Sequence, residues 1–166
     1  MKKRGQMQIS FGMIFSILLI IFFVAIAFYS IKKLLEFQDS ARIINFKNAL
    51  QNDIDKTWKS SNTPSQEFGK NSPLPSKVKK VCFIDFSNPA RENESLYKEL
   101  KKYSGENRNL FLYPVFSYLE NSMNLENIDL EKTTELENPL CFEVINSKIS
   151  LVLQKNFSES LVTIKK

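Results

Sequence analysis

The chain has 166 residues, a formal net charge of +5 and no histidine. Once Lys2, Lys3 and Arg4 are set aside, 20 basic and 18 acidic residues remain, interspersed along the chain, so the basic character does not indicate a nucleic-acid-binding surface. The missing imidazole removes the usual general base and metal ligand near neutral pH, and the sequence has no glycine-rich phosphate loop. We therefore expect no enzyme, no cofactor, no metal site and no nucleic-acid partner.

Residues 9–31 form an uncharged, strongly apolar run, which predicts a transmembrane helix. A helix of this length rises about 34 Å and so exceeds the roughly 30 Å core of a bilayer. Residues 1–8 then form a basic tail. A cleaved secretory signal peptide is the alternative, because residues 25–27 read Ala-Ile-Ala, but no polar stretch separates that site from the apolar run.

The orientation of this single span follows from its flanks. The positive cluster at residues 2–4 favours a cytoplasmic N-terminus in the cell membrane and a C-terminal domain outside the cytoplasm. Lys32 and Lys33, on the other side of the span, weaken this preference.

Residues 32–61 have the pattern of an amphipathic stalk helix, with apolar side chains at spacings of three and four. No glycine or proline interrupts residues 13–63, so the span and the stalk are expected to form one rod. We expect Ile54 and Trp58 to pack against a sheet at its far end. Residues 62–78, rich in proline, serine and asparagine, are expected to form a loop.

Residues 79–166 are expected to form an extracytoplasmic α+β domain. Residues 79–86 are apolar on both faces, as in a central strand. The next segment predicts a short helix with Asn88 as its N-cap, Pro89 in its first turn and Gly105 just past its end.

The remaining elements are expected to be mostly strands. Residues 109–116 predict a strand whose Pro114 places it at a sheet edge or strand end, and residues 160–166 predict a last strand. Residues 117–138 are polar and ambiguous between loop and helix. The fold class is therefore α+β: a long N-terminal transmembrane and stalk helix packed on a small antiparallel β-sheet with one short helix.

Two alternating apolar runs flank Asn146-Ser147 and predict a β-hairpin with a two-residue turn. In that register three apolar pairs face each other on one side of the hairpin. These pairs are Val144 with Ile149, Phe142 with Leu151 and Leu140 with Leu153.

Cys82 and Cys141 each lie in a predicted strand, and two cysteines alone cannot make a zinc site. If the domain lies outside the cytoplasm, they are expected to form a disulfide; the alternative is a pair of buried free thiols.

Two further polar pairs stand close together in the sequence. Asp85 and Ser87, at a strand end before a helix, resemble an active-site layout, but without a base to activate the serine we interpret them as cap and turn residues. Glu135 and Glu137 form an acidic pair that does not predict a cation site.

The N-terminus resembles a known family. Lys3-Arg4-Gly5-Gln6, followed at once by a long apolar helix, resembles the class III signal peptide of archaeal type IV pilins and pilin-like proteins. The resemblance implies cleavage by a prepilin peptidase after Gly5, with Gln6 as the first mature residue, and a helix half in the membrane and half on an antiparallel sheet. Ser10 stands where the family usually has a glutamate implicated in subunit registration.

Two functions from different classes follow. The first is a pilin-like structural or adhesion subunit whose partners are itself or other pilin-like subunits and the lipid bilayer. The second is a monomeric, membrane-tethered binding or accessory module of an envelope or secretion complex.

Overall fold

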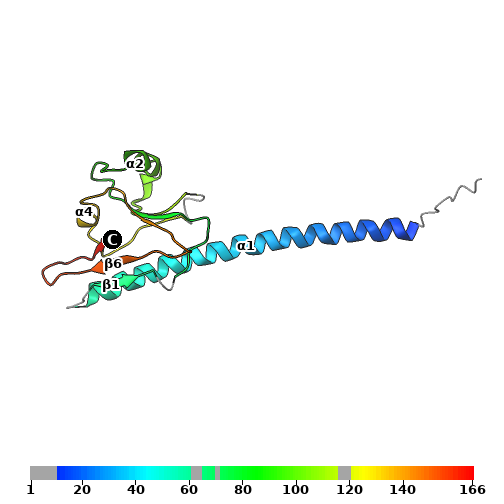
Figure 1. Ribbon diagram of the computed structural model, residues 1–166, viewed down its shortest axis with the longest axis horizontal. Coiled ribbons are helices and arrows are strands. Elements are labelled where there is room, and N and C mark those ends of the chain that lie inside the picture. The colour runs from blue at the N-terminus through cyan, green and yellow to red at the C-terminus, as the bar shows by residue number, and fades with distance from the viewer. Residues whose placement is uncertain (1–10, 61–64, 70–71, 116–120) are drawn as a thin grey trace, which may run out of the picture. The chain divides into compact units, whose positions relative to one another are not determined.

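The computed structural model describes residues 11–60, 65–69, 72–115 and 121–166 (Figure 1). Its elements, in chain order, are α1 (Phe11–Lys59), β1 (Gln66–Phe68), β2 (Lys80–Phe83), α2 (Glu94–Lys101), the 3₁₀ helix η1 (Ser104–Glu106), β3 (Leu110–Tyr113), β4 (Ser122–Met123), α4 (Leu130–Thr133), β5 (Leu140–Glu143), β6 (Leu151–Gln154) and β7 (Thr163–Lys165). The chain divides into two compact units, residues 1–38 (unit 1) and residues 39–166 (unit 2), and α1 contributes to both. The predicted α+β class and the long N-terminal apolar helix are confirmed.

In unit 1, residues 11–31 of α1 are apolar around the whole circumference of the helix. None of the side chains of residues 11–38 is buried, which distinguishes this stretch from a core helix of a soluble protein. The helix is long and apolar enough to cross a membrane. Its small polar side chains need no outside partner: the Ser16 hydroxyl donates a hydrogen bond of 2.8 Å to the Gly12 carbonyl.

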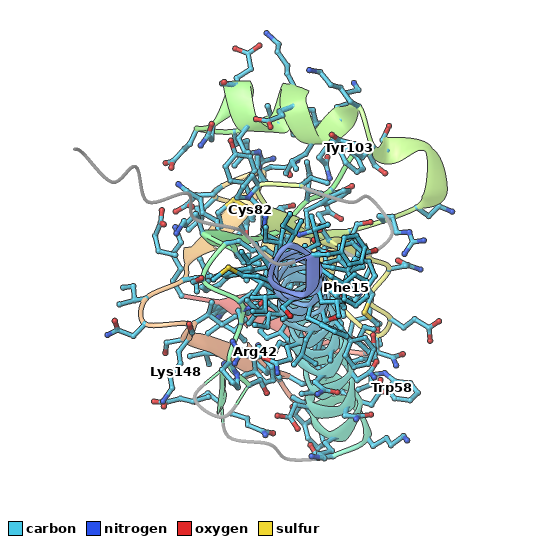
Figure 2. The ribbon with its side chains drawn as sticks, turned by 90° about the vertical axis from the view of Figure 1, so that its right-hand side faces the viewer. Phe15, Arg42, Trp58, Cys82, Tyr103 and Lys148 are labelled. Carbon is cyan, nitrogen blue, oxygen red and sulfur yellow. A yellow bond between two sulfur atoms is a disulfide. The ribbon has the colours of Figure 1, made fainter. Side chains whose placement is uncertain are left out.

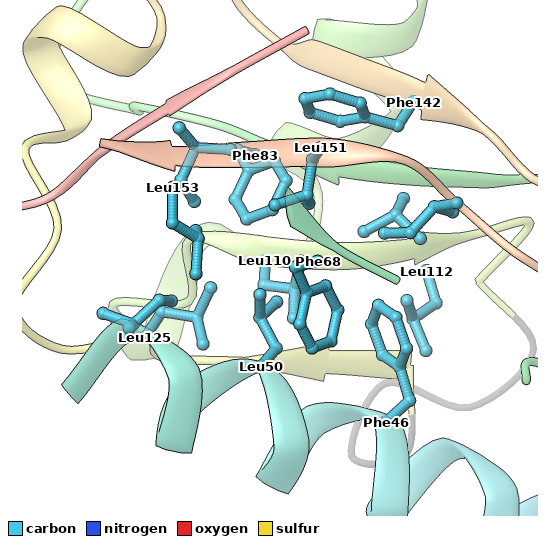
Figure 3. Packing of buried hydrophobic residues seen from close by; sticks show 14 of the residues in the cluster. Phe46, Leu50, Phe68, Phe83, Leu110, Leu112, Leu125, Phe142, Leu151 and Leu153 are labelled. Carbon is cyan, nitrogen blue, oxygen red and sulfur yellow. The ribbon is translucent and has the colours of Figure 1, made fainter. Parts of the chain in front are cut away.

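In unit 2, the same helix buries one stripe of side chains. Ile43, Phe46, Leu50 and Ile54 recur at spacings of three and four and are fully buried. Figure 3 shows Phe46 and Leu50 pointing from α1 towards Phe68 of β1. The Phe46 and Phe68 rings meet edge to face with their centroids 5.6 Å apart. The stalk helix is therefore amphipathic, as predicted.

The remaining core lies between two antiparallel sheets rather than on the single sheet that was expected. One sheet has the order β1-β6-β7 and the other has the order β4-β3-β2-β5. Alternate residues of the four-stranded sheet face two separate clusters. Val81 and Phe83 join the α1 cluster, whereas Cys82 and Ile84 pack against α2. Because β2 is buried on both faces, the prediction of a central strand is confirmed.

The predicted hairpin turn is present, but its two strands separate. Asn146 and Ser147 have positive φ angles of 51° and 62°, and Ile145 and Lys148 exchange backbone hydrogen bonds of 2.8 and 3.0 Å across them. Beyond this pair, β5 joins β2 and β6 joins β1 and β7. The predicted pairing of the two strands is therefore wrong. All six apolar residues of the hairpin nevertheless belong to one cluster or pack against it: Leu140, Phe142, Val144, Ile149, Leu151 and Leu153.

The helix α2 begins later than the sequence predicted. Its N-cap is Asn93, whose side chain accepts a hydrogen bond of 3.1 Å from the Leu96 N–H group, and not Asn88. The carbonyls of Asn88 and Pro89 accept hydrogen bonds from a buried side chain instead, and Glu92 has a φ angle of 63°, which a helix cannot accommodate. Gly105 lies within η1, four residues past the last residue of α2.

Two other expectations about local structure need correction or refinement. The segment 62–78 is not all loop, because it contains β1, whose three residues pair with β6. Pro114 directly follows β3, which has a partner on each side, so it marks a strand end rather than an edge strand. The polar region before β5 contains β4 and α4.

Trp58 does not lie in the core, contrary to the expectation for the end of the stalk. Its side chain is 37% exposed, and its indole N–H group donates a hydrogen bond of 2.9 Å to the Ser160 carbonyl. The smaller Thr57 takes the buried position and satisfies its hydroxyl by donating to the Asp53 carbonyl. Ile54 is fully buried, as predicted.

The stripe of α1 gives a direct stability test. Leu50→Ala removes a fully buried side chain and should lower the free energy of unfolding by about 3 kcal/mol. Ile44→Ala, on the exposed face of the same helix, should change it by less than about 0.5 kcal/mol. Denaturant unfolding of the full chain in detergent, followed by the fluorescence of its one tryptophan, measures both. Equal effects of the two substitutions would contradict the packing of α1.

Candidate functional site

The predicted processing residues Gly5 and Gln6, together with Ser10, lie outside the described residues. The structure therefore begins just after the segment on which the family resemblance rests.

The pair Asp85 and Ser87 is a turn, as interpreted from the sequence. One carboxylate oxygen of Asp85 accepts the Ser87 N–H group at 2.8 Å, and the other accepts the Asn88 side-chain amide at 2.7 Å. Burial raises the pKa of Tyr97, and the nearby charge of Asp85 raises it further. The Tyr97 hydroxyl donates a hydrogen bond of 2.9 Å to the Asn88 carbonyl. These interactions hold the connection between β2 and α2 in place.

Asn138 is the central polar residue of this region, and the sequence did not reveal it. Its side chain is fully buried, accepts the Asp85 N–H group at 3.1 Å and donates to the Asp85 carbonyl at 2.8 Å. The same amide group donates to the carbonyls of Asn88 and Pro89 at 3.2 and 3.1 Å. In the sequence, an asparagine before a proline is an ordinary turn signal, and no local pattern distinguishes it from one that links two distant segments.

The disulfide expected from the sequence is present. Cys82 and Cys141 are directly opposite each other in the antiparallel register of β2 and β5, with Cα atoms 4.1 Å apart. The Val144 N–H group donates to the Lys79 carbonyl, so the alternation of the ladder makes the cysteines a non-hydrogen-bonded pair, the arrangement that brings side chains closest. In Figure 2, Cys82 lies on the same side of the sheet as Tyr103, which packs against the α2 cluster.

Cys141 also borders a surface depression of about 670 Å³ beside β5. Of the five charged residues that line it, four form two ion pairs, Lys80 with Glu143 at 2.8 Å and Lys166 with Glu137, and the fifth is Glu92. Because positive and negative side chains both line the depression, its charge does not favour a ligand of either sign.

The expected acidic pair is not a joint site. The Glu137 carboxylate binds Lys166, whereas the backbone carbonyl of Glu135 accepts a hydrogen bond from Arg91. Within the described ranges, no group of three or more histidine, cysteine, aspartate or glutamate side chains could hold a metal ion.

The loop between β6 and β7 is held at two adjacent residues, Glu159 and Ser160. Trp58 of α1 binds the Ser160 carbonyl, and Lys132 of α4 forms an ion pair of 2.9 Å with Glu159. The Lys132 ammonium group, with hydrogen bonds from Asn156, lowers the pKa of Glu159 to about 2. Phe157, two residues before Glu159, is 90% exposed.

Comparisons of this chain with protein-family models, with curated proteins and with solved structures found no match.

Asn138 provides a test of this polar cluster. Asn138→Ala should lower the free energy of unfolding by about 3 kcal/mol, because several buried backbone groups lose their partners. The control is Asn45→Ala on the exposed face of α1, where the gain in helix propensity should leave stability unchanged or slightly raised. Thermal unfolding by circular dichroism compares the two. An unchanged melting temperature for Asn138→Ala would refute the central role of this residue.

The disulfide closes a loop with a sequence separation of 59 residues and should contribute about 4 kcal/mol in the chain-entropy model. We expect mass spectrometry of unreduced native protein to find no cysteine open to alkylation. The double variant Cys82→Ala/Cys141→Ala should unfold at clearly lower denaturant concentration than oxidised wild type and close to reduced wild type. Two readily alkylated thiols in unreduced protein would contradict the pairing.

Proposed function

We propose that this protein is a single-pass, membrane-anchored, non-enzymatic protein whose unit 2 lies outside the cytoplasm as a pilin-like structural or adhesion subunit. One observation carries the proposal: α1 changes from a helix exposed and apolar on every side to a helix with one buried stripe, without a break between Phe11 and Lys59. The first half suits lipid and the second half suits a folded unit in water.

The extracytoplasmic location is supported by two further features. A disulfide persists in oxidising surroundings and is rare in the cytosol. The positive cluster at residues 2–4 favours retention of the N-terminus in the cytoplasm.

The pilin-like role is supported by the Lys3-Arg4-Gly5-Gln6 motif directly before the apolar helix. The second candidate, a monomeric tethered module of an envelope or secretion complex, is favoured by Ser10, which replaces the glutamate on which the family relies for subunit registration. The native size of the protein extracted from membranes in mild detergent separates the two: an assembly of many copies supports the first and a monomer supports the second.

The anchor itself is tested by Ile20→Arg, which places a charge in the middle of the apolar run and should weaken insertion by about 3 kcal/mol. We expect part of this variant to leave the membrane fraction, whereas the control Asn48→Arg, on the exposed side of α1 in unit 2, should remain in it. If both variants stay entirely in membranes, the anchor lies elsewhere.

N-terminal sequencing of the membrane-bound wild type shows whether the chain is cleaved. A first residue of Met1 indicates an uncut anchor, Gln6 indicates pilin-like cleavage, and Phe28 indicates cleavage of a secretory signal peptide.

A further inference from the structure

We propose that Asn156 is an N-glycosylation site, at which a saccharide is attached to the side-chain amide nitrogen. The inference rests on the proposed location of unit 2 outside the cytoplasm, and it adds a covalent modification to that proposal.

The sequence motif for this modification is Asn-x-Ser or Asn-x-Thr, with any residue except proline at x. The chain contains two triplets of this form, Asn93-Glu94-Ser95 and Asn156-Phe157-Ser158. Because the motif spans three residues, an acceptor site has to present all three of them to the transferring enzyme. The local structure of each triplet therefore decides between the two.

The triplet at Asn156 forms the tip of a turn between β6 and β7. The Glu159 N–H group donates to the Asn156 carbonyl at 3.0 Å, the bond that closes a β-turn, and Phe157 and Ser158 are the two central residues of this turn. Asn156 and Ser158 are exposed, and Phe157 is 90% exposed. Figure 1 shows the connection between β6 and β7 projecting beyond the strands of unit 2. All three residues of the motif are thus presented at the surface.

The base of this turn is held to the rest of unit 2. Glu159 forms an ion pair of 2.9 Å with Lys132, and the Ser160 carbonyl accepts a hydrogen bond from the Trp58 indole N–H group. A bulky group at the tip of the turn can therefore project into solvent without displacing either contact. A saccharide on Asn156 would also shield the exposed aromatic ring next to it, in keeping with the solubilising effect of surface glycans.

The hydrogen bonds of the Asn156 side chain are compatible with the modification. Its amide oxygen accepts a hydrogen bond of 3.2 Å from the Gln154 amide, and glycosylation leaves that oxygen in place. The Asn156 side chain also forms a hydrogen bond with the Glu159 carboxylate, for which the amide nitrogen needs only one of its two hydrogens. The saccharide replaces the other hydrogen, so neither bond has to break.

The triplet at Asn93 is exposed as well, but it is wound into the start of α2. The Asn93 side chain caps the Leu96 N–H group, and the Asn93 carbonyl accepts the Tyr97 N–H group at 3.0 Å. Ser95 lies in the first turn of the helix. This triplet could be presented as a projecting loop only if the first turn of α2 unwound. It is therefore a matched comparison, with the same motif on a helical backbone.

The modification is a group transfer from an activated donor. The donor is a saccharide joined to a polyprenyl lipid through a phosphate or diphosphate group. A bond forms between the Asn156 amide nitrogen and the anomeric carbon of the saccharide, and the bond between that carbon and the phosphate oxygen breaks. The lipid phosphate leaves with the electron pair, and the amide nitrogen gives one proton to a base of the transferring enzyme.

The test is mass spectrometry of the full chain purified from the membranes of the cells that produce it. We expect the peptide that contains Asn156 to carry a saccharide in most copies and the peptide that contains Asn93 to carry none. Asn156→Gln should lower the intact mass by the mass of the saccharide, whereas Asn93→Gln should leave the saccharide in place. Circular dichroism verifies that both variants keep the fold.

Two substitutions of Ser158 test whether the motif itself is recognised. Ser158→Ala removes the hydroxyl group that the motif requires and should abolish the modification, although Asn156 is unchanged. Ser158→Thr keeps the motif and should preserve the modification. Loss of the saccharide in both variants, or its persistence in both, would overturn the inference.

A further measurement separates this inference from the proposed function. A membrane-impermeant lysine reagent added to intact cells reports the location of unit 2 through Lys98, whose side chain is 70% exposed. Labelled Lys98 with unmodified Asn156 would overturn the glycosylation alone, and so would a saccharide on Asn93 in place of Asn156. Lys98 that is labelled only after the cells are permeabilised, with unmodified Asn156, would overturn both proposals.

Discussion

The burial of one stripe of α1 by unit 2 is the interaction on which the rest of the structure depends. Four fully buried side chains, Ile43, Phe46, Leu50 and Ile54, bring the helix to residues of both sheets. Neither sheet is large enough to form a core by itself, since their strands have only two to four residues. The helix therefore supplies the apolar surface that joins the two sheets. The part of α1 before the stripe, residues 11–38, has no buried side chain.

The four-stranded sheet divides the core of unit 2 into two clusters with different roles. On one face it meets α1 and the second sheet, and on the other it meets α2. The disulfide between Cys82 and Cys141 belongs to the second side, where the apolar cluster is smaller. The disulfide thus adds a covalent link between neighbouring strands on the face with the smaller cluster.

Much of the fold could be predicted because its signals are local. The uncharged run of α1, the two apolar faces of β2 and the Asn146-Ser147 turn are each determined by neighbouring residues. The remainder depends on partners that are distant in sequence. β1 forms a strand only through its pairing with β6. The two strands next to the turn separate because β5 pairs with β2 and β6 pairs with β1.

The candidate site shows the same division. The Cys82–Cys141 pairing could be anticipated from the composition of two strands, whereas Asn138 could not, because its hydrogen-bond partners lie about fifty residues earlier. Trp58 was misassigned for a different reason. Helical spacing allowed either Thr57 or Trp58 at the last buried position, and the indole N–H group found its acceptor at the surface.

The order of strands in the β1-β6-β7 sheet has a consequence for biosynthesis. β1 ends at Phe68, yet its partner β6 begins only at Leu151, after four intervening strands in the part of the chain that is described. The stripe of α1 is synthesised before every strand that covers it, and β6 and β7 come last among the described strands. Such long-range closure is slow relative to local pairing and leaves apolar surface open to aggregation in the interval. The folding of the α1 stripe therefore depends on strands that are synthesised long after it.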